Sequence, residues 1–194
     1  MPKIEIRRAT RRDLPPISKL AGALVRQHYG FDAKRFLLIP EPEAGYEWWF
    51  GKELDNAKAL ILAAKLDKKV VGYAYARLES KDWNALLDAH GALHDILVEE
   101  SARGQGIGRM LLERVQQELR ERGAPRIVLH TAVQNAAAHK LFESCGFRRT
   151  MLEMTCELAA PEPDADNRGA AAVVPARARR RRPAKAAKNR TRAR

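Results

Sequence analysis

Hydrophobic residues recur at two different periods along the chain, and the changes of period mark the expected secondary structure. Alternating or continuous apolar runs predict strands, whereas apolar residues three or four positions apart predict helices. Strands are expected over residues 3–8, 59–65, 70–79, 93–98, 126–131 and 148–158. Helices are expected over residues 14–29, 45–54, 107–122 and 136–144. This order predicts an α/β (α+β) fold with a mixed, mostly antiparallel sheet flanked by helices on both sides.

The stretch 93–123 joins a strand, a glycine-rich turn and an amphipathic helix. Strand residues alternate, with Leu93, Asp95 and Leu97 on one side and His94, Ile96 and Val98 on the other. His94 and Asp95 are therefore expected on opposite faces of the sheet, where Asp95 would anchor the structure. The helix carries an apolar stripe that is expected to face the core: Ile107, Leu111, Leu112, Val115 and Leu119.

Three glycines, Gly104, Gly106 and Gly108, lie in the turn between this strand and this helix. Such a turn directs several backbone N–H groups at one point, and the helix N-terminus behind it adds positive charge, so the expected ligand is a phosphate or pyrophosphate. Arg103 and Arg109 would strengthen that preference. The alternative is a connection that only reverses the chain. The turn matches neither the Walker A loop nor the G-x-G-x-x-G fingerprint.

Two segments together resemble a known family. Arg103-Gly104-Gln105-Gly106-Ile107-Gly108 resembles the acetyl-CoA signature (Q/R)-x-x-G-x-(G/A) of the GNAT superfamily of N-acetyltransferases. The later segment NAAAHKLFESCGF is similar to the family's N-x-x-A-x-x-L-Y-x-x-x-G-F segment, through Asn135, Ala138, Leu141, Phe142, Gly146 and Phe147. The resemblance covers residues 4–158 and implies the GNAT fold.

The resemblance implies how acetyl-CoA would be held. In the family, the central strand and the strand after its helix separate, and the pantetheine arm lies in the gap and bonds to backbone. Leu97 and Val98 would supply those backbone contacts, and Asn135 would reach the arm, cap its helix, or do both. The pyrophosphate would lie on a continuous run: Arg103, Gly104, Gln105, Gly106, Ile107, Gly108 and Arg109.

Direct transfer of an acetyl group from the thioester to an amine is the implied reaction. By analogy with the family, the backbone N–H of Val98 would stabilise the oxyanion. His94 stands where polyamine acetyltransferases of the family carry a glutamate, so it is the expected base, although a packed strand histidine explains it equally well. Many relatives have a tyrosine as general acid where this chain has Phe142. Tyr73, Tyr75 or a water would then supply the proton, or the thiolate would leave unassisted.

Two regions are expected to border the acceptor site, because the family places that site there. The first is the helix 45–54, and the second is the insert 80–91. Aromatic residues on the helix would line the pocket or pack in the core: Tyr46, Trp48, Trp49 and Phe50. The acidic residues nearby would attract a cationic amine or are simply solvated: Glu41, Glu43 and Glu47.

Composition indicates one domain with an appendage in a soluble protein: 194 residues, 45% hydrophobic residues and a net charge of +12. Two cysteines, Cys145 and Cys156, form no disulfide framework, which favours a reducing, cytoplasmic location. The N-terminus lacks an apolar segment of signal-peptide length, and the apolar run 59–64 is too short to span a bilayer, so no membrane association is expected. No metal is expected, and a homodimer remains open.

From residue 159 the sequence becomes rich in Pro, Ala and Arg, with 11 Lys and Arg against 3 Asp and Glu. Such a segment has too little apolar surface to fold alone, so we expect a GNAT domain over 1–158 and a disordered basic tail over 159–194. The tail would contact nucleic acid without sequence preference, or it has no specific role.

Two functions therefore stand at this point. The first is an N-acetyltransferase that uses acetyl-CoA as cosubstrate and acetylates a primary amine on a small molecule or a protein. The second is a nucleic-acid-associated binding protein that keeps the fold with weak catalysis, as Phe142 and the tail suggest. The intact glycine turn favours the first.

Overall fold

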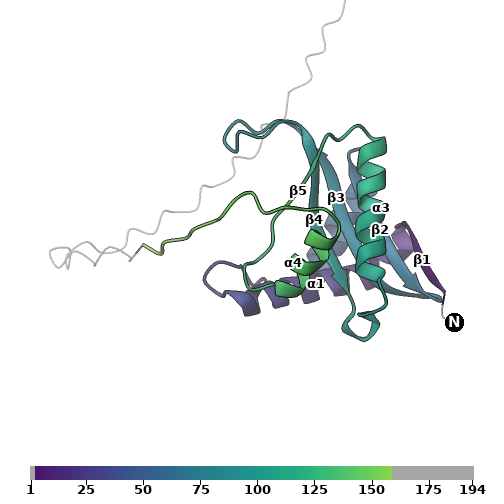
Figure 1. Ribbon diagram of the computed structural model, residues 1–194. Helices are drawn as coiled ribbons and strands as arrows, with labels where there is room; N and C mark the ends of the chain where they lie inside the picture. The colour runs from purple at the N-terminus through teal and green to yellow at the C-terminus, as the bar shows by residue number, and fades with distance from the viewer. Residues whose placement is uncertain (1–2, 159–194) are drawn as a thin grey trace, which may run out of the picture. The chain divides into compact units, whose positions relative to one another are not determined.

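The computed structural model describes residues 3–158. Its sheet has the strand order β1-β2-β3-β4-β5: β1 (Ile4–Arg8), β2 (Ala59–Leu66), β3 (Lys69–Glu79), β4 (His90–Val98) and β5 (Ile127–Leu129). Neighbours from β1 to β4 are antiparallel, and β5 runs parallel to β4. The helices are α1 (Leu14–Phe31), α2 (Pro42–Glu53), α3 (Ile107–Glu121) and α4 (Ala136–Ser144). The mixed, mostly antiparallel sheet expected from the sequence is thereby confirmed (Figure 1).

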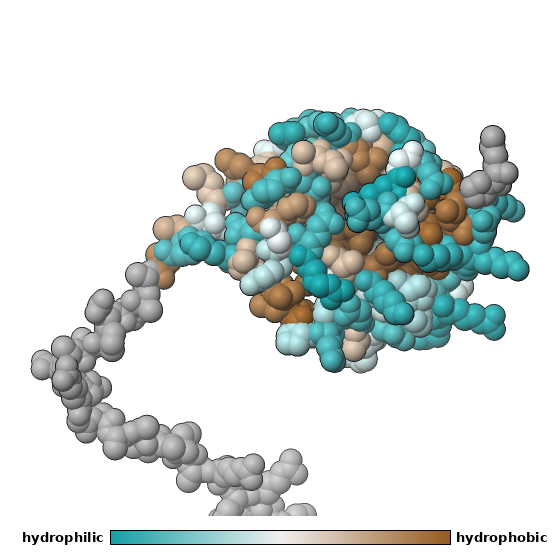
Figure 2. Space-filling model, turned by 90° about the horizontal axis from the view of Figure 1, so that it is seen from below, coloured by the Kyte–Doolittle hydropathy of each residue, from teal (hydrophilic) through white to brown (hydrophobic). Residues whose placement is uncertain are grey.

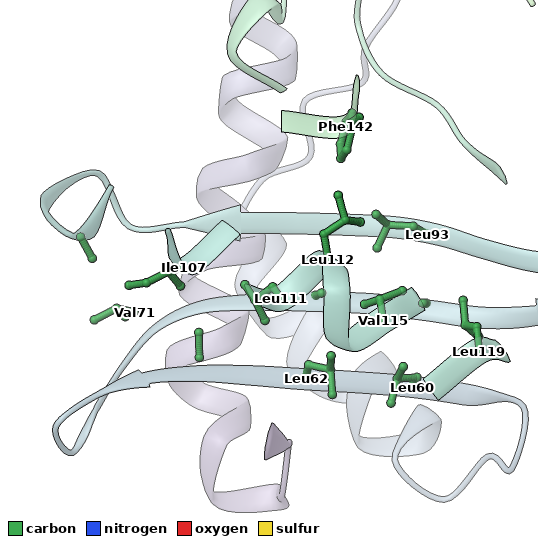
Figure 3. Packing of buried hydrophobic residues seen from close by; sticks show 14 residues of the cluster. Leu60, Leu62, Val71, Leu93, Ile107, Leu111, Leu112, Val115, Leu119 and Phe142 are labelled. Carbon is green, nitrogen blue, oxygen red and sulfur yellow. The ribbon is translucent and has the colours of Figure 1, made fainter. Parts of the chain in front are cut away.

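Each face of the sheet buries its own apolar cluster. On one face, α3 and α4 cover the sheet, and Figure 3 shows the α3 stripe and Phe142 of α4 directed toward Leu93 and the residues of β2. Ile107, Leu111, Leu112, Val115 and Leu119 are at most 1% exposed, so the predicted stripe of α3 is confirmed as core. On the other face, α1 and α2 pack their apolar residues against β2 and β3, with Phe50 and Tyr73 fully buried.

A buried ion pair holds β1 to the start of α1. Asp13 is 2% exposed and accepts hydrogen bonds from both terminal nitrogens of Arg7, at 2.9 and 2.8 Å, and from the backbone and hydroxyl of Thr10. Lys65 of β2 lies 3.3 Å from the same carboxylate. Burial alone would raise the pKa of Asp13, but these hydrogen bonds outweigh it and hold the pKa well below its usual range. Asp13 therefore stays charged although it is buried, because Arg7, Thr10 and Lys65 surround its carboxylate.

The predicted closing strand is wrong. Residues 148–158 form no strand, and β5 has three residues where 126–131 was expected. A strand needs a neighbour's free backbone groups to pair with, and so short a β5 offers few of them. Large apolar side chains of this segment are 71–89% exposed: Met151, Leu152, Met154 and Leu158. In Figure 2, hydrophobic residues, drawn in brown, lie next to the first grey atoms that follow this segment. The tail prediction concerns residues 159–194, which lie outside the described part of the chain.

A β-bulge interrupts the register between β3 and β4. Tyr75 is opposite Asp95, and the next residue, Ala76, is opposite Leu93, so His94 has no partner of its own on β3. A bulge of this kind adds one residue to one strand and shifts the alternation of side chains beyond it. The parts of β4 before and after the bulge therefore alternate their side chains between the two faces in opposite phase.

The prediction that His94 and Asp95 point to opposite faces is wrong because of this bulge. Leu93 packs in the cluster under α3, and so do Ile96 and Val98. His94 stacks on Tyr75, and Asp95 accepts a hydrogen bond from Tyr73, so both side chains lie on the face covered by α1 and α2. Two polar side chains that regular alternation would separate are thus brought to one face.

Candidate active site

The second half of β4 has a free edge. Parallel pairing with β5 begins at Gly91 and ends at Leu93, opposite Leu129. The N–H of Glu99 donates to Val71 on the β3 side, and because N–H groups alternate in direction along a strand, the N–H of Val98 points away from β3. This is the edge from which β5 has separated. The geometry agrees with the gap implied by the family resemblance, with Val98 N–H directed toward it.

The glycine turn follows directly below this edge, after a 3-10 turn at Glu100–Ala102. Gly104 and Gly106 have φ angles of +78° and +79°, in the left-handed region that glycine adopts most readily. Gly106 is the residue before the first turn of α3, and that end of the helix has no side-chain cap and no acidic residue. Its first backbone N–H groups therefore remain available to an anion, which favours the phosphate interpretation over a mere connection.

The other predicted residues of the turn have distinct environments. Arg103 is exposed and donates from Nε to the carbonyl of Val98 at 3.1 Å, so it joins the free edge to the turn. Gln105 is exposed, and Ile107 is buried, which leaves only the backbone of Ile107 for a ligand. Arg109 donates to the hydroxyl of Ser144 on α4, at 2.9 Å. Its guanidinium is therefore engaged in tying α3 to α4.

The second motif lies on α4. The side chain of Asn135 accepts the backbone N–H of Ala138 at 3.2 Å, as the helix-cap interpretation predicted. Phe142 is 7% exposed and packs in the cluster under α3 and near Phe147. It therefore serves as a core residue and has no proton to donate.

A pocket of about 300 Å³ opens on the opposite face, between α2, β3 and β4. We call it the aromatic pocket; it is lined by Tyr46, Trp49, Phe50, Tyr75, Arg77, Glu79, His94 and Asp95. A larger hollow of about 530 Å³ lies between α2 and the chain around Arg11. There Arg11 pairs with Asp55, and Lys52 lies over the ring of Trp48.

His94 lies at the rim of the aromatic pocket. Its Nε2 is 3.2 Å from Oε1 of Glu79, and its ring stacks on that of Tyr75 with centroids 5.3 Å apart. The side chain is 42% exposed. A carboxylate on one ring nitrogen orients the imidazole and leaves the other nitrogen available to exchange protons. The exposure argues against a histidine that is merely packed in the sheet.

Tyr75 and Tyr73 both donate their hydroxyl protons to carboxylates. The Tyr75 hydroxyl is 2.6 Å from Glu53, and the Tyr73 hydroxyl is 3.1 Å from Asp95. Burial and the neighbouring carboxylates raise the pKa of both phenols above the ordinary value. Both effects make these tyrosines poor proton donors.

Asp95 lines the aromatic pocket beside His94. Burial raises its pKa above the usual range, and the hydrogen bond from Tyr73 works in the opposite direction. Burial and the charge of Asp95 also raise the pKa of Tyr46 to about 12. Asp95 had been expected to anchor structure, and its place beside His94 became visible only with the bulge.

Several charged residues in and behind the aromatic pocket were not identified from the sequence. Arg77 and Glu79 line the pocket 3.6 Å apart, and Glu53 lies behind them, 3.4 Å from Arg77. They lie on two elements about 25 positions apart in the chain, so no local spacing relates them. The acidic residues suggested earlier do not line this pocket: Glu41, Glu43 and Glu47. Trp49 does line it, whereas Trp83 of the insert is exposed elsewhere on the surface.

Two negative findings complete the description. Within residues 3–158, no three His, Cys, Asp or Glu side chains are placed to hold a metal ion. Over the same residues, none of the helices combines the length and the apolar character needed to cross a bilayer.

Comparison with known proteins finds similar acetyltransferases. An aminoglycoside N(6')-acetyltransferase type 1 of Stenotrophomonas maltophilia is 32% identical over 97 residues, which are 50% of this chain and 63% of that protein. The ribosomal protein bS18 alanine N-acetyltransferase of Salmonella typhimurium is 40% identical over 104 residues, 54% of this chain and 64% of that protein. The chain thus spans just under two thirds of the length of each.

A solved structure shows the same fold: the aminoglycoside N-acetyltransferase AAC(6')-Iy in complex with CoA, with a TM-score of 0.66 and 19% identity over 82% of this chain and 97% of that one. The model of the acetyltransferase (GNAT) family matches residues 23–147, which include the free edge of β4, the glycine turn and the α4 motif. The resemblance drawn from two short motifs is therefore confirmed over most of the described residues, and this chain belongs to the acetyltransferase (GNAT) family.

Proposed function

We propose that the protein is an N-acetyltransferase that transfers the acetyl group of acetyl-CoA to a primary amine within a ternary complex. The observation that carries the proposal is the free edge of β4 above an uncapped, glycine-rich helix start. These two features offer backbone donors to an extended arm and to a pyrophosphate. The relatives named for acetylation of an aminoglycoside and of a ribosomal protein, and the neighbour solved with CoA, support the same reaction.

The residues present suit acetyl-CoA. Arg103 and the N–H groups at Gly104, Gly106 and the first turn of α3 would bind the pyrophosphate. The free edge at Val98 would bind the arm, whereas the backbone of Leu97 faces β3 by the same alternation and is not available, contrary to the sequence-based expectation. Asn135 caps α4 and would at most contact the arm in addition. Arg109, tied to Ser144, would contribute position rather than a direct contact.

The reaction needs a free amine, an oxyanion donor and a departing thiolate. His94, oriented by Glu79, would take one proton from the acceptor ammonium, directly or through water. The amine nitrogen then attacks the thioester carbonyl carbon, and the new C–N bond forms as the carbonyl oxygen gains negative charge beside Val98 N–H. Collapse of this intermediate breaks the C–S bond.

The CoA thiolate would leave without a protein acid. Phe142 has no proton to give, and Tyr73 and Tyr75 donate theirs to carboxylates. The second proton of the amine nitrogen would then pass to the thiolate through water. Atoms and charge balance as ammonium and acetyl-CoA give amide, CoA thiol and one proton. The predicted role of Tyr75 therefore becomes support of the His94 ring rather than proton donation.

The test combines binding and turnover with the full chain. Acetyl-CoA is titrated by calorimetry, and CoA release is followed by mass spectrometry with a panel of amines. His94→Gln is expected to lower kcat about 10²-fold or more while the Kd for acetyl-CoA stays unchanged. Glu79→Gln, which keeps an acceptor beside His94, is expected to lower kcat less. Absence of acetyl-CoA binding would overturn the proposal, and an unchanged rate in His94→Gln would remove His94 as the base.

A further inference from the structure

The lining of the aromatic pocket indicates which acceptor it binds; this inference rests on the proposed acetyl transfer. We propose that it accepts an amine with a single positive charge on an apolar or aromatic body, and that Asp95 is the carboxylate that binds the ammonium group. Three observations carry this inference: the walls of the pocket, its charge pairing and the position of Asp95 on β4.

The walls are largely aromatic. Tyr46, Trp49 and Phe50 come from α2, and Tyr75 faces them from β3. Phe50 lies 5.3 Å from Tyr46 and 5.2 Å from Tyr75 between ring centroids, so the rings form one continuous surface. Trp49 is 39% exposed and adds to it at the opening. Aromatic faces attract both apolar groups and organic cations.

Charge pairing leaves one carboxylate without a cation. Glu79 lies within 4 Å of both Arg77 and His94. Glu53, behind the wall, accepts from Tyr75 and lies 3.4 Å from Arg77. Asp95 accepts a hydrogen bond from the neutral hydroxyl of Tyr73, and no cationic side chain within residues 3–158 forms an ion pair with it.

A partly buried carboxylate with no cationic partner is costly to keep charged. Burial raises the pKa of Asp95, whereas the hydrogen bond from Tyr73 and the nearby imidazoles of His94 and His28 favour the charged form. An ammonium group would supply the missing positive charge. One such carboxylate matches one ammonium, whereas a molecule with several ammonium groups would bring the others toward the guanidinium of Arg77 in the same pocket.

The position of Asp95 suits the reaction. Asp95 and Leu97 share one face of β4, two residues apart, which is roughly 7 Å along a strand. An amine at Asp95 would therefore lie beside His94 and within reach of the free edge at Val98. The bulge that brings His94 and Asp95 to one face places a proton acceptor next to the ammonium site.

The experiment compares amines at fixed ionic strength with the full chain. The panel is 2-phenylethylamine, n-butylamine, spermidine, kanamycin and an alanyl tripeptide. We expect kcat/KM for 2-phenylethylamine to exceed that for spermidine and kanamycin at least about tenfold. Preference for a polycation or for the tripeptide would overturn the assignment.

Variants test the assigned residues. Asp95→Asn keeps the shape and an acceptor for Tyr73, and it is expected to lower kcat/KM for 2-phenylethylamine at least about 30-fold, chiefly through KM, with the Kd for acetyl-CoA unchanged. Asp67→Asn removes the same charge from an exposed turn between β2 and β3 and should change neither quantity. Trp49→Ala should lower kcat/KM for 2-phenylethylamine more than kcat/KM for n-butylamine. An unchanged KM in Asp95→Asn would refute the role of Asp95.

Direct binding separates this inference from the proposed function. 2-Phenylethylamine is titrated by calorimetry in the presence of CoA, which requires no turnover. If the amine binds the unaltered chain and not Asp95→Asn, while no amine releases CoA from acetyl-CoA, the acetyl-transfer proposal fails and the pocket assignment stands. If acetyl transfer occurs and the amine binds both proteins equally, the pocket assignment fails alone.

Discussion

Replacement of Gly106 by alanine tests the glycine turn with a magnitude that the structure defines. Gly106 has φ of +79°, and a Cβ atom built on it meets no other atom within 4 Å. The substitution therefore introduces no clash within the protein, and its cost is the left-handed backbone of an L-residue, about 1–2 kcal/mol. A glycine that only filled a gap in the chain would show no such cost.

The cost is divided between folding and binding. If the turn keeps its conformation in Gly106→Ala, the free energy of unfolding falls by about 1–2 kcal/mol and the Kd for acetyl-CoA is unchanged. If the turn relaxes in the free protein, stability changes less, and binding must restore the left-handed form, which weakens the Kd by up to about 5- to 30-fold. Together the two losses should amount to about 1–2 kcal/mol.

Urea unfolding and calorimetric titration of acetyl-CoA measure the two parts separately. Gly30→Ala is the matched control, since Gly30 lies in α1 without a positive φ and its added Cβ also meets nothing within 4 Å. That change should leave the Kd unchanged and raise stability by up to about 1 kcal/mol. If Gly106→Ala alters neither stability nor affinity, the turn does not require a left-handed residue, and the argument for a preformed anion site loses its basis.

Three other changes follow from the structure. Asp13→Asn places an amide donor against Arg7, so urea unfolding at pH 7 should show a loss of about 3 kcal/mol or more. Because the folded-state pKa of Asp13 is depressed, its contribution is present above its unfolded-state pKa and is lost as pH falls, so the difference between the two proteins should shrink in unfolding curves below about pH 4. Leu112→Ala removes a fully buried side chain from the cluster under α3 and should cost about 2–5 kcal/mol in the same assay. Arg103→Ala should lower the affinity for acetyl-CoA about tenfold at low salt and less at high salt, and Arg103→Lys should have an intermediate effect. Equal affinity in the two variants and the unaltered chain would place the pyrophosphate elsewhere.

Features encoded by neighbouring residues were predictable from the sequence. The apolar stripe of α3, its start after Gly106 and the cap at Asn135 all depend on residues within a few positions of each other. The two family motifs have the same local character, which is why they identified the family and the cosubstrate region. The hydrogen-bond partners of side chains were harder to predict. Arg109 is an example, because only folding brings Ser144 to its guanidinium.

Features that depend on partners far along the chain were missed. The segment 148–158 has enough apolar residues for a strand, but strand formation also depends on the length of β5, which its own residues do not encode. Arg77 and Glu79 of β3 line the aromatic pocket, and Arg77 also pairs with Glu53 of α2 behind it. This arrangement depends on how α2 packs on the sheet, and the pattern of α2 alone shows only an aromatic helix.

The bulge in β4 has a physical cause that its sequence partly contains. Regular alternation would place Leu93 and Asp95 on one face, so that burying Leu93 under α3 would carry Asp95 into the same apolar cluster. An unpaired carboxylate there would cost several kcal/mol. One extra residue at His94 lets Leu93 share a face with Ile96 and Val98 while both polar side chains turn to the aromatic pocket. The adjacent polar pair within an apolar strand was the available signal, and the arrangement that keeps charge out of the core is the same one that sets a proton acceptor beside a carboxylate.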